Sequence, residues 1–125
     1  EHYARVRARS LRLLAPLSAE DACVQAMPDT SPTKWHLAHV TWFFETFVLE
    51  AREQPFHAFH PAFRELFNSY YNGIGRQFPR PERGLLTRPS LAEVLAYRAD
   101  VDARMAPLLA DADEALAATI ELGLH

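Results

Sequence analysis

Two histidines lie three residues apart in an unusually aromatic stretch of the sequence, Ser31–Leu49. If this stretch is helical, His36 and His39 lie on neighbouring positions of the helix surface and could face one metal ion. A helical projection places Trp35 and Trp42 on the same side as His39. We therefore expect the imidazole of His39 to point into the packed interior, walled by aromatic rings. Each nitrogen of a buried imidazole needs a hydrogen-bond partner or a metal ion.

A simpler interpretation of His39 is a core residue whose ring nitrogens are satisfied by protein groups. An HxxH pair without a third ligand is weak evidence for a metal site. His57 and His60 lie in a loop that contains Pro55, and we expect both to be surface residues. Cys23 is expected to be a small core residue, because no electropositive setting that would activate its thiol is visible.

A second concentration of chemically useful residues lies in the segment Gly73–Pro89, GIGRQFPRPERGLLTRP. This segment contains Arg76, Arg80, Arg83 and Arg88. Long irregular loops inside compact domains are often functional, and guanidinium groups have the right shape to bind carboxylates. The alternative is a solvated connection whose arginines pair with nearby acids.

Composition restricts the class of protein. The chain has 125 residues, enough for one domain with a real core, and its net charge of −3 gives no electrostatic case for nucleic-acid binding. Glu45 interrupts the best candidate for a membrane span, and the first residues lack the apolar segment of a signal peptide. The single cysteine fits a reducing compartment, so we expect a cytoplasmic protein. The first residue is not Met, and we expect the chain to be part of a longer one.

Helical periodicity and the scarcity of glycine predict an all-α fold, an antiparallel four-helix bundle. The predicted helices span residues 2–15, 18–27, 31–52, 61–72, 90–107 and 114–125. In the first helix we expect Leu11 and Leu13 to make apolar contacts, and Arg7 to lie on a solvated face with the other arginines.

Several helix ends carry recognisable capping residues. Ser31 is expected to cap the aromatic helix, and Ser90 with Glu93 forms a capping box. Asp111 or Asp113 is expected to cap the last helix. Nothing terminates that helix before His125, so we expect it to be incomplete.

Five blocks of the sequence together resemble a known family: SPTKWHLAHVTWFFETFVL, FRELFNSYYNGIG, RPERGLLTRPS, EVLAYRADVD and IELGLH. They resemble the N-terminal DinB-like domain of the sulfoxide synthases of ergothioneine biosynthesis. The resemblance covers about the whole chain, residues 1–125, with the blocks in the same order.

The resemblance implies a non-haem Fe(II) site with three histidine ligands. His39 matches the ligand from the WHLAH-type helix. The other two ligands belong to an HxxxH motif that follows the ELGLH-type segment, so the metal site is expected to be incomplete in residues 1–125. A C-terminal domain similar to formylglycine-generating enzymes, which supplies a catalytic tyrosine and much of the substrate pocket, is absent from this sequence.

The reaction implied by the resemblance joins a cysteine-type thiol to the imidazole C2 of trimethylhistidine with O2 and leaves a sulfoxide. Arg80 and Arg83 have the RxxR spacing of arginines that hold the carboxylates of the thiol substrate in some relatives. We expect residues 1–125 alone to be inactive. We also expect them to self-associate, because an incomplete last helix would leave apolar surface uncovered.

Three other functions remain open at this point. DinB-like relatives include zinc-dependent thiol transferases with a similar three-histidine site. Relatives that form selenoneine or ovothiol share close N-terminal blocks. The last alternative is a non-catalytic helical module in which His36 and His39 only pack.

Overall fold

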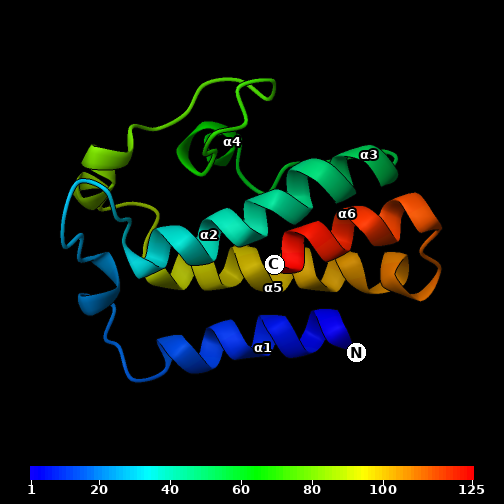
Figure 1. Cartoon of the computed structure of the whole chain (residues 1–125), viewed down its shortest axis with the longest axis horizontal. Helices are drawn as coiled ribbons and strands as arrows, with labels where there is room; N and C mark the ends of the chain where they lie inside the picture. Colours follow the sequence, from blue (N-terminus) through cyan, green and yellow to red (C-terminus); the bar gives the residue numbers. More distant parts are fainter.

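The computed structural model describes residues 1–125, which form helices and connecting loops without any strand, as predicted. Four long helical segments lie side by side, and a short helix covers one of them (Figure 1). The α-helices are α1 (His2–Leu14), α2 (Thr33–Phe44), α3 (Glu50–Arg52), α4 (Phe63–Leu66), α5 (Leu91–Ala110) and α6 (Glu114–Leu124). None of the helices combines the length and the apolarity that a membrane crossing requires.

The long helices form two antiparallel pairs. α1 runs opposite to α2, and α5 runs opposite to α6, whereas α2 and α5 run in the same direction (Figure 1). The parallel arrangement of α2 and α5 requires the chain to cross back along the bundle, and residues 53–90 make this crossing. α2 lies at the centre of the packing, in contact with α5 and α6.

The aromatic stretch forms one continuous helical run from Thr33 to Arg52, as predicted. Its middle part, η2 (Glu45–Leu49), has π-helical hydrogen bonding, an irregularity that is frequent near functional sites. The carboxylate of Glu45 is buried and accepts hydrogen bonds from the Tyr97 hydroxyl at 2.8 Å and from the Phe59 backbone N–H at 3.0 Å. These bonds tie α2 to α5 and to the crossing segment.

The first helix differs from the prediction in the direction of its side chains. Leu11 and Leu13 are exposed, whereas Arg7 is buried. The Nε atom of Arg7 donates to Asp102 at 2.8 Å, and one terminal nitrogen donates to the Thr41 hydroxyl at 2.9 Å. A buried guanidinium is tolerated here because a carboxylate and a hydroxyl from two neighbouring helices receive its hydrogen bonds.

Three predicted helix boundaries were wrong. Residues 18–27 form only a 3₁₀ turn, η1 (Asp21–Cys23), and the predicted helix 61–72 ends after four residues as α4. Ser31 does not cap α2, because Pro32 occupies the cap position and the Ser31 hydroxyl accepts a hydrogen bond from Arg83 instead. Two caps are confirmed: the Ser90 hydroxyl accepts from the Glu93 backbone N–H, and Asp113 caps α6. The second half of the capping box is absent, because the Glu93 carboxylate accepts a hydrogen bond from the Ser90 hydroxyl and not from its backbone N–H.

Gly123 allows α6 to approach α2 closely. A Cβ atom at this position would lie 2.5 Å from Cδ1 of Phe43 and 2.9 Å from Cε1 of Phe44. Both rings are buried and have little freedom to move. We therefore expect Gly123→Ala to lower the free energy of unfolding by about 1–3 kcal/mol, measured by chemical denaturation.

Gly73→Ala is the matched control for this prediction. A Cβ atom added at Gly73 would meet no other atom within 4 Å, so the replacement should change the free energy of unfolding by less than about 0.5 kcal/mol. Equal stabilities of the two variants would show that α6 does not pack against Phe43 as closely as described.

Candidate functional site

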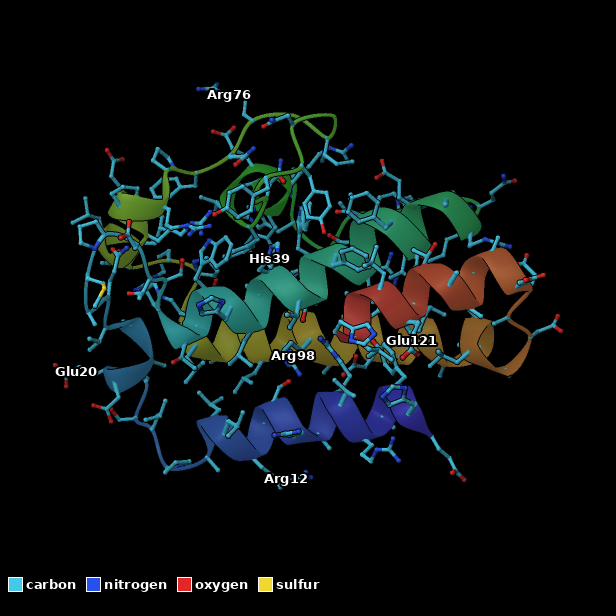
Figure 2. All side chains as sticks on the ribbon, viewed as in Figure 1. Arg12, Glu20, His39, Arg76, Arg98 and Glu121 are labelled. Atoms are coloured by element: carbon cyan, nitrogen blue, oxygen red, sulfur yellow. The ribbon has the colours of Figure 1, made fainter.

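His39 lies between the two indole rings of its own helix. Its imidazole stacks on Trp35 with ring centroids 4.9 Å apart and planes 11° from parallel, and on Trp42 at 5.5 Å and 16°. Figure 2 shows His39 on the side of α2 that faces α4 and the adjoining loop. The predicted aromatic walls are present, but the ring is only half-buried and lies at the edge of the bundle rather than at its centre.

The hydrogen bond of His39 determines which of its two ring nitrogens has a lone pair available for a ligand. Nδ1 lies 2.7 Å from the backbone carbonyl oxygen of Phe67. A carbonyl oxygen only accepts, so Nδ1 must carry the proton, and the neutral ring then has its lone pair on Nε2. No protein group in the structure hydrogen-bonds Nε2, and this atom is not sealed from solvent. An imidazole that donates from one nitrogen to a backbone carbonyl and offers the other has the arrangement typical of histidine metal ligands.

The same face of α2 binds the backbone of residues 64–67 in two further places. Nε1 of Trp42 donates to the carbonyl of Arg64 at 3.2 Å, and Nε1 of Trp35 donates to the carbonyl of Leu66 at 2.9 Å. Together with His39, three ring N–H groups therefore satisfy three carbonyls at the end of α4. These contacts fix the orientation of all three rings. They also satisfy carbonyls at the end of α4 that the backbone N–H groups of a longer helix would have bonded.

Burial lowers the pKa of His39 below its ordinary value of 6.5; the hydrogen bond to Phe67 opposes this shift, and the charges of Arg83 and His36 add to it. The ring is therefore neutral at pH 7.

The lowered pKa of His39 makes the stability of the fold depend on pH. In the unfolded chain the imidazole gains a proton near pH 6.5, and in the folded chain only at lower pH, so protonation favours unfolding. We expect the free energy of unfolding to fall as the pH drops below 6.5, and to fall less steeply in His39→Gln, measured by denaturation across this pH range. Equal slopes for the two proteins would contradict the lowered pKa.

His39 borders a pocket of about 480 Å³ between α2, the segment after α4 and η3, the 3₁₀ turn Arg80–Leu85. Both predicted arginines also border it, so the structure brings all three predicted site residues together. The pocket is lined by Asp29, Thr30, Ser31, Trp35, His36, His39, Ser69, Tyr70, Tyr71, Arg80 and Arg83. Its volume lies in the range of small-molecule pockets.

Arg83 is a buried cation that donates one hydrogen bond to the protein. Its guanidinium carbon lies 3.6 Å from the ring centroid of Trp35, and one terminal nitrogen donates to the Ser31 hydroxyl at 3.0 Å. Only 3% of the residue is exposed, and its Nε atom has no partner. Burial, and then the charge of Arg80, lowers the pKa of Arg83 to about 10, so it remains a cation at neutral pH. An anionic ligand in the adjoining pocket would compensate the positive charge of Arg83.

Arg80 is more accessible than Arg83. Its guanidinium lies 4.8 Å from the ring centroid of Tyr70 and donates hydrogen bonds to the Tyr70 hydroxyl and to the carbonyl of Asp29. Tyr70 is 74% exposed and has a left-handed backbone conformation, with φ of 65°. Arg76, by contrast, points away from the molecule (Figure 2), and Arg88 is also exposed. The loop thus contributes two of its four arginines to the pocket.

The backbone around Tyr70 is shaped by the buried side chain of Asn68. Its amide nitrogen donates to the carbonyls of Tyr71, Gly75 and Arg76 at 3.1–3.3 Å. These bonds hold the segment after α4 in a closed loop, which places Tyr70 and Tyr71 at the pocket. Sequence periodicity missed this arrangement because the aromatic spacing of residues 63–70 is also that of a helix; Asn68 was the only signal of a loop.

Of the other candidate histidines, His36 borders this site, and His57 and His60 lie apart from it. His57 and His60 are exposed, as predicted, and His60 stacks on Phe63. His36 borders the same pocket as His39, and burial together with the charges of Arg83 and Arg80 lowers its pKa. Within residues 1–125, no three His, Cys, Asp or Glu side chains come together in a way that could hold a metal ion. The described residues therefore provide one well-oriented nitrogen that could bind a metal ion, not a complete site.

Comparison with known proteins identifies the family. No curated protein matches the sequence. The sequence pattern of the DinB superfamily, in contrast, matches residues 2–123, nearly the whole chain. The all-helical architecture agrees with this match, since DinB-like domains are helical bundles. The chain belongs to the DinB superfamily.

Proposed function

We propose that this chain is the metal-binding domain of an Fe(II)- and O2-dependent sulfoxide synthase of ergothioneine biosynthesis. The observation that carries the proposal is His39: its Nδ1–H is held by a backbone carbonyl, and its Nε2 is unpaired beside a pocket that contains two arginines. Membership of the DinB superfamily, whose domains are often metal-dependent enzymes, supports a metal role. The order and length of the sequence blocks favour a sulfoxide synthase over other members.

Residues 1–125 contain one of the three proposed metal ligands, His39. His39 offers a neutral nitrogen, as Fe(II) bound by imidazoles requires, and no set of three potential ligands comes together around it. The other two are proposed to come from an HxxxH motif beyond His125. A three-histidine Fe(II) site supplies open positions for substrates and O2. The role of this chain is to fix one ligand and one wall of the substrate pocket.

Arg80 and Arg83 are proposed to bind the carboxylates of the thiol substrate. They lie on the same pocket as His39, so a thiol compound of amino-acid size could place its carboxylate on the arginines and its sulfur near the metal. The charge of Arg83, which no carboxylate of the chain pairs, supports this role. The remaining pocket residues and a catalytic tyrosine are proposed to belong to a C-terminal domain similar to formylglycine-generating enzymes.

The test is an assay of the full-length protein, isolated without oxygen and loaded with Fe(II). The proposal predicts that a cysteine-type thiol, trimethylhistidine and O2 give a sulfoxide with a carbon–sulfur bond at the imidazole C2, identified by mass spectrometry. Absence of this product with every cysteine-type thiol would refute the proposal. Residues 1–125 alone should form no product, because two ligands and part of the pocket are missing.

The main alternative is a zinc-dependent thiol transferase, which the three-histidine arrangement would also suit. Metal analysis of the protein as isolated separates the two functions. Zinc without iron, together with transfer of a thiol to electrophiles, would favour the transferase. Products containing selenium or a sulfur atom on another imidazole carbon would indicate a selenoneine- or ovothiol-forming relative.

A further inference from the structure

Gln25 connects three separate parts of the backbone although it borders neither the pocket nor the metal ligand. Its amide nitrogen donates to the carbonyl of Thr30 at 2.8 Å and to the carbonyl of Arg80 at 2.7 Å. Its amide oxygen accepts a hydrogen bond from the backbone N–H of Gly84 at 2.6 Å. One side chain thus joins the segment before α2 to both ends of the turn η3.

The contacts of Gln25 admit only one orientation of its amide. The two carbonyls can only accept and the Gly84 N–H can only donate, so exchanging the amide oxygen and nitrogen would break all three bonds. Gly84 also allows the close approach, because a Cβ atom there would lie 2.7 Å from the amide oxygen and 2.8 Å from Cβ of Gln25. The amide of Gln25 can therefore make these three hydrogen bonds only because residue 84 is a glycine.

The segments that Gln25 joins form two walls of the pocket. Thr30 lies in the wall formed by Asp29–Ser31, and Arg80 and Arg83 form the neighbouring wall on η3. Two other bonds between these walls, from Arg83 to the Ser31 hydroxyl and from Arg80 to the carbonyl of Asp29, use the arginine side chains themselves and would compete with a bound carboxylate. Gln25 joins the walls from outside the pocket, where a ligand does not interfere.

We infer that Gln25 is a positioning residue, which sets the distance between the Asp29–Ser31 wall and the two arginines and thereby determines the affinity for the carboxylate of the thiol substrate. This inference rests on the proposed function, because it assigns Arg80 and Arg83 to the substrate. Gln25 touches neither substrate nor metal. Its loss should therefore change the binding of the thiol without changing the metal content.

The test uses Gln25→Glu in the full-length protein. Glutamate has nearly the same shape, but it replaces the two donated hydrogen bonds by contacts between oxygen atoms. We expect the KM for the thiol to rise about tenfold, with kcat within about twofold of wild type and Fe(II) content unchanged. Gln54→Glu is the matched control, because Gln54 is exposed and makes no side-chain hydrogen bond in the structure. It should leave KM and kcat unchanged.

A binding measurement separates this inference from the proposed function. L-cysteine serves as the probe, and its binding to the Fe(II)-loaded protein is followed by calorimetry. Weaker binding in Gln25→Glu than in Gln54→Glu would support the inference even if no sulfoxide is formed. Unchanged KM and unchanged affinity for L-cysteine in Gln25→Glu would overturn the inference and leave the proposed function intact. No binding of any cysteine-type thiol to the wild-type protein would overturn both.

Discussion

Replacing His39 by alanine in the full-length protein should abolish stoichiometric Fe(II) binding and sulfoxide formation. The ring is held between two indoles with Nε2 unpaired, so its removal deletes a preformed ligand rather than a side chain that adapts to the metal. Changing a group that only orients a ligand costs about 10–100-fold in metal affinity. Loss of the ligand itself should therefore cost more than about 100-fold, measured as iron content after equilibration with Fe(II).

Two further variants make this result interpretable. His39→Gln keeps an amide that can donate to the Phe67 carbonyl, so it should fold like wild type and still fail to bind Fe(II). His57→Ala removes an exposed histidine of the crossing segment and should retain full iron content. Normal iron content and turnover in His39→Gln would show that His39 is only a packing residue.

Replacing Trp42 by alanine should produce the largest loss of stability of any single change at the site. Its side chain is fully buried, and its Nε1–H satisfies the carbonyl of Arg64. Truncation of a buried tryptophan typically costs about 3–5 kcal/mol, and here it also leaves a carbonyl without a partner. The midpoint of chemical denaturation measures this loss. The imidazole of His39 would also lose one of its two stacking partners.

Trp42→Phe separates the packing from the hydrogen bond. It retains an aromatic ring against His39 but has no N–H, so its loss of stability should lie between those of wild type and Trp42→Ala. Leu13→Ala is the control for a general effect of truncation, because Leu13 is 69% exposed and should change stability by less than about 0.5 kcal/mol. A loss in Trp42→Ala as small as in Leu13→Ala would contradict the packing described here.

The helices of the bundle could be predicted because their signals are local. The aromatic run of α2, the cap at Ser90 and the cap at Asp113 each depend on residues close together in sequence. The all-helical fold follows from these signals. The directions of the helices do not, because the return of residues 53–90 along the bundle depends on contacts across the whole domain.

The end of α4 shows why some local predictions failed. The spacing of aromatic residues from Phe63 to Tyr70 is helical, yet the helix ends at Leu66. Side chains of α2 take the carbonyls there, and Asn68 takes three carbonyls of the following loop. The prediction that Arg7 lies on a solvated face failed for a similar reason, because its partners Thr41 and Asp102 are distant in sequence.

The candidate site was predictable in its residue types but not in its construction. Helical spacing placed two indoles beside His39, and resemblance to a family drew attention to Arg80 and Arg83. Neither source indicated that a backbone carbonyl would orient the imidazole. The role of Gln25 was also invisible, because its three partners are backbone atoms, which no side-chain pattern reveals.

The most direct test of the central claim is a crystal structure of the full-length protein with Fe(II), using anomalous scattering at the iron edge to locate the metal. We predict an iron peak at about 2.0–2.2 Å from Nε2 of His39, with Nδ1 still bonded to the carbonyl of Phe67. An iron peak away from His39, or an imidazole whose Nε2 is bonded to another protein group, would contradict the assignment.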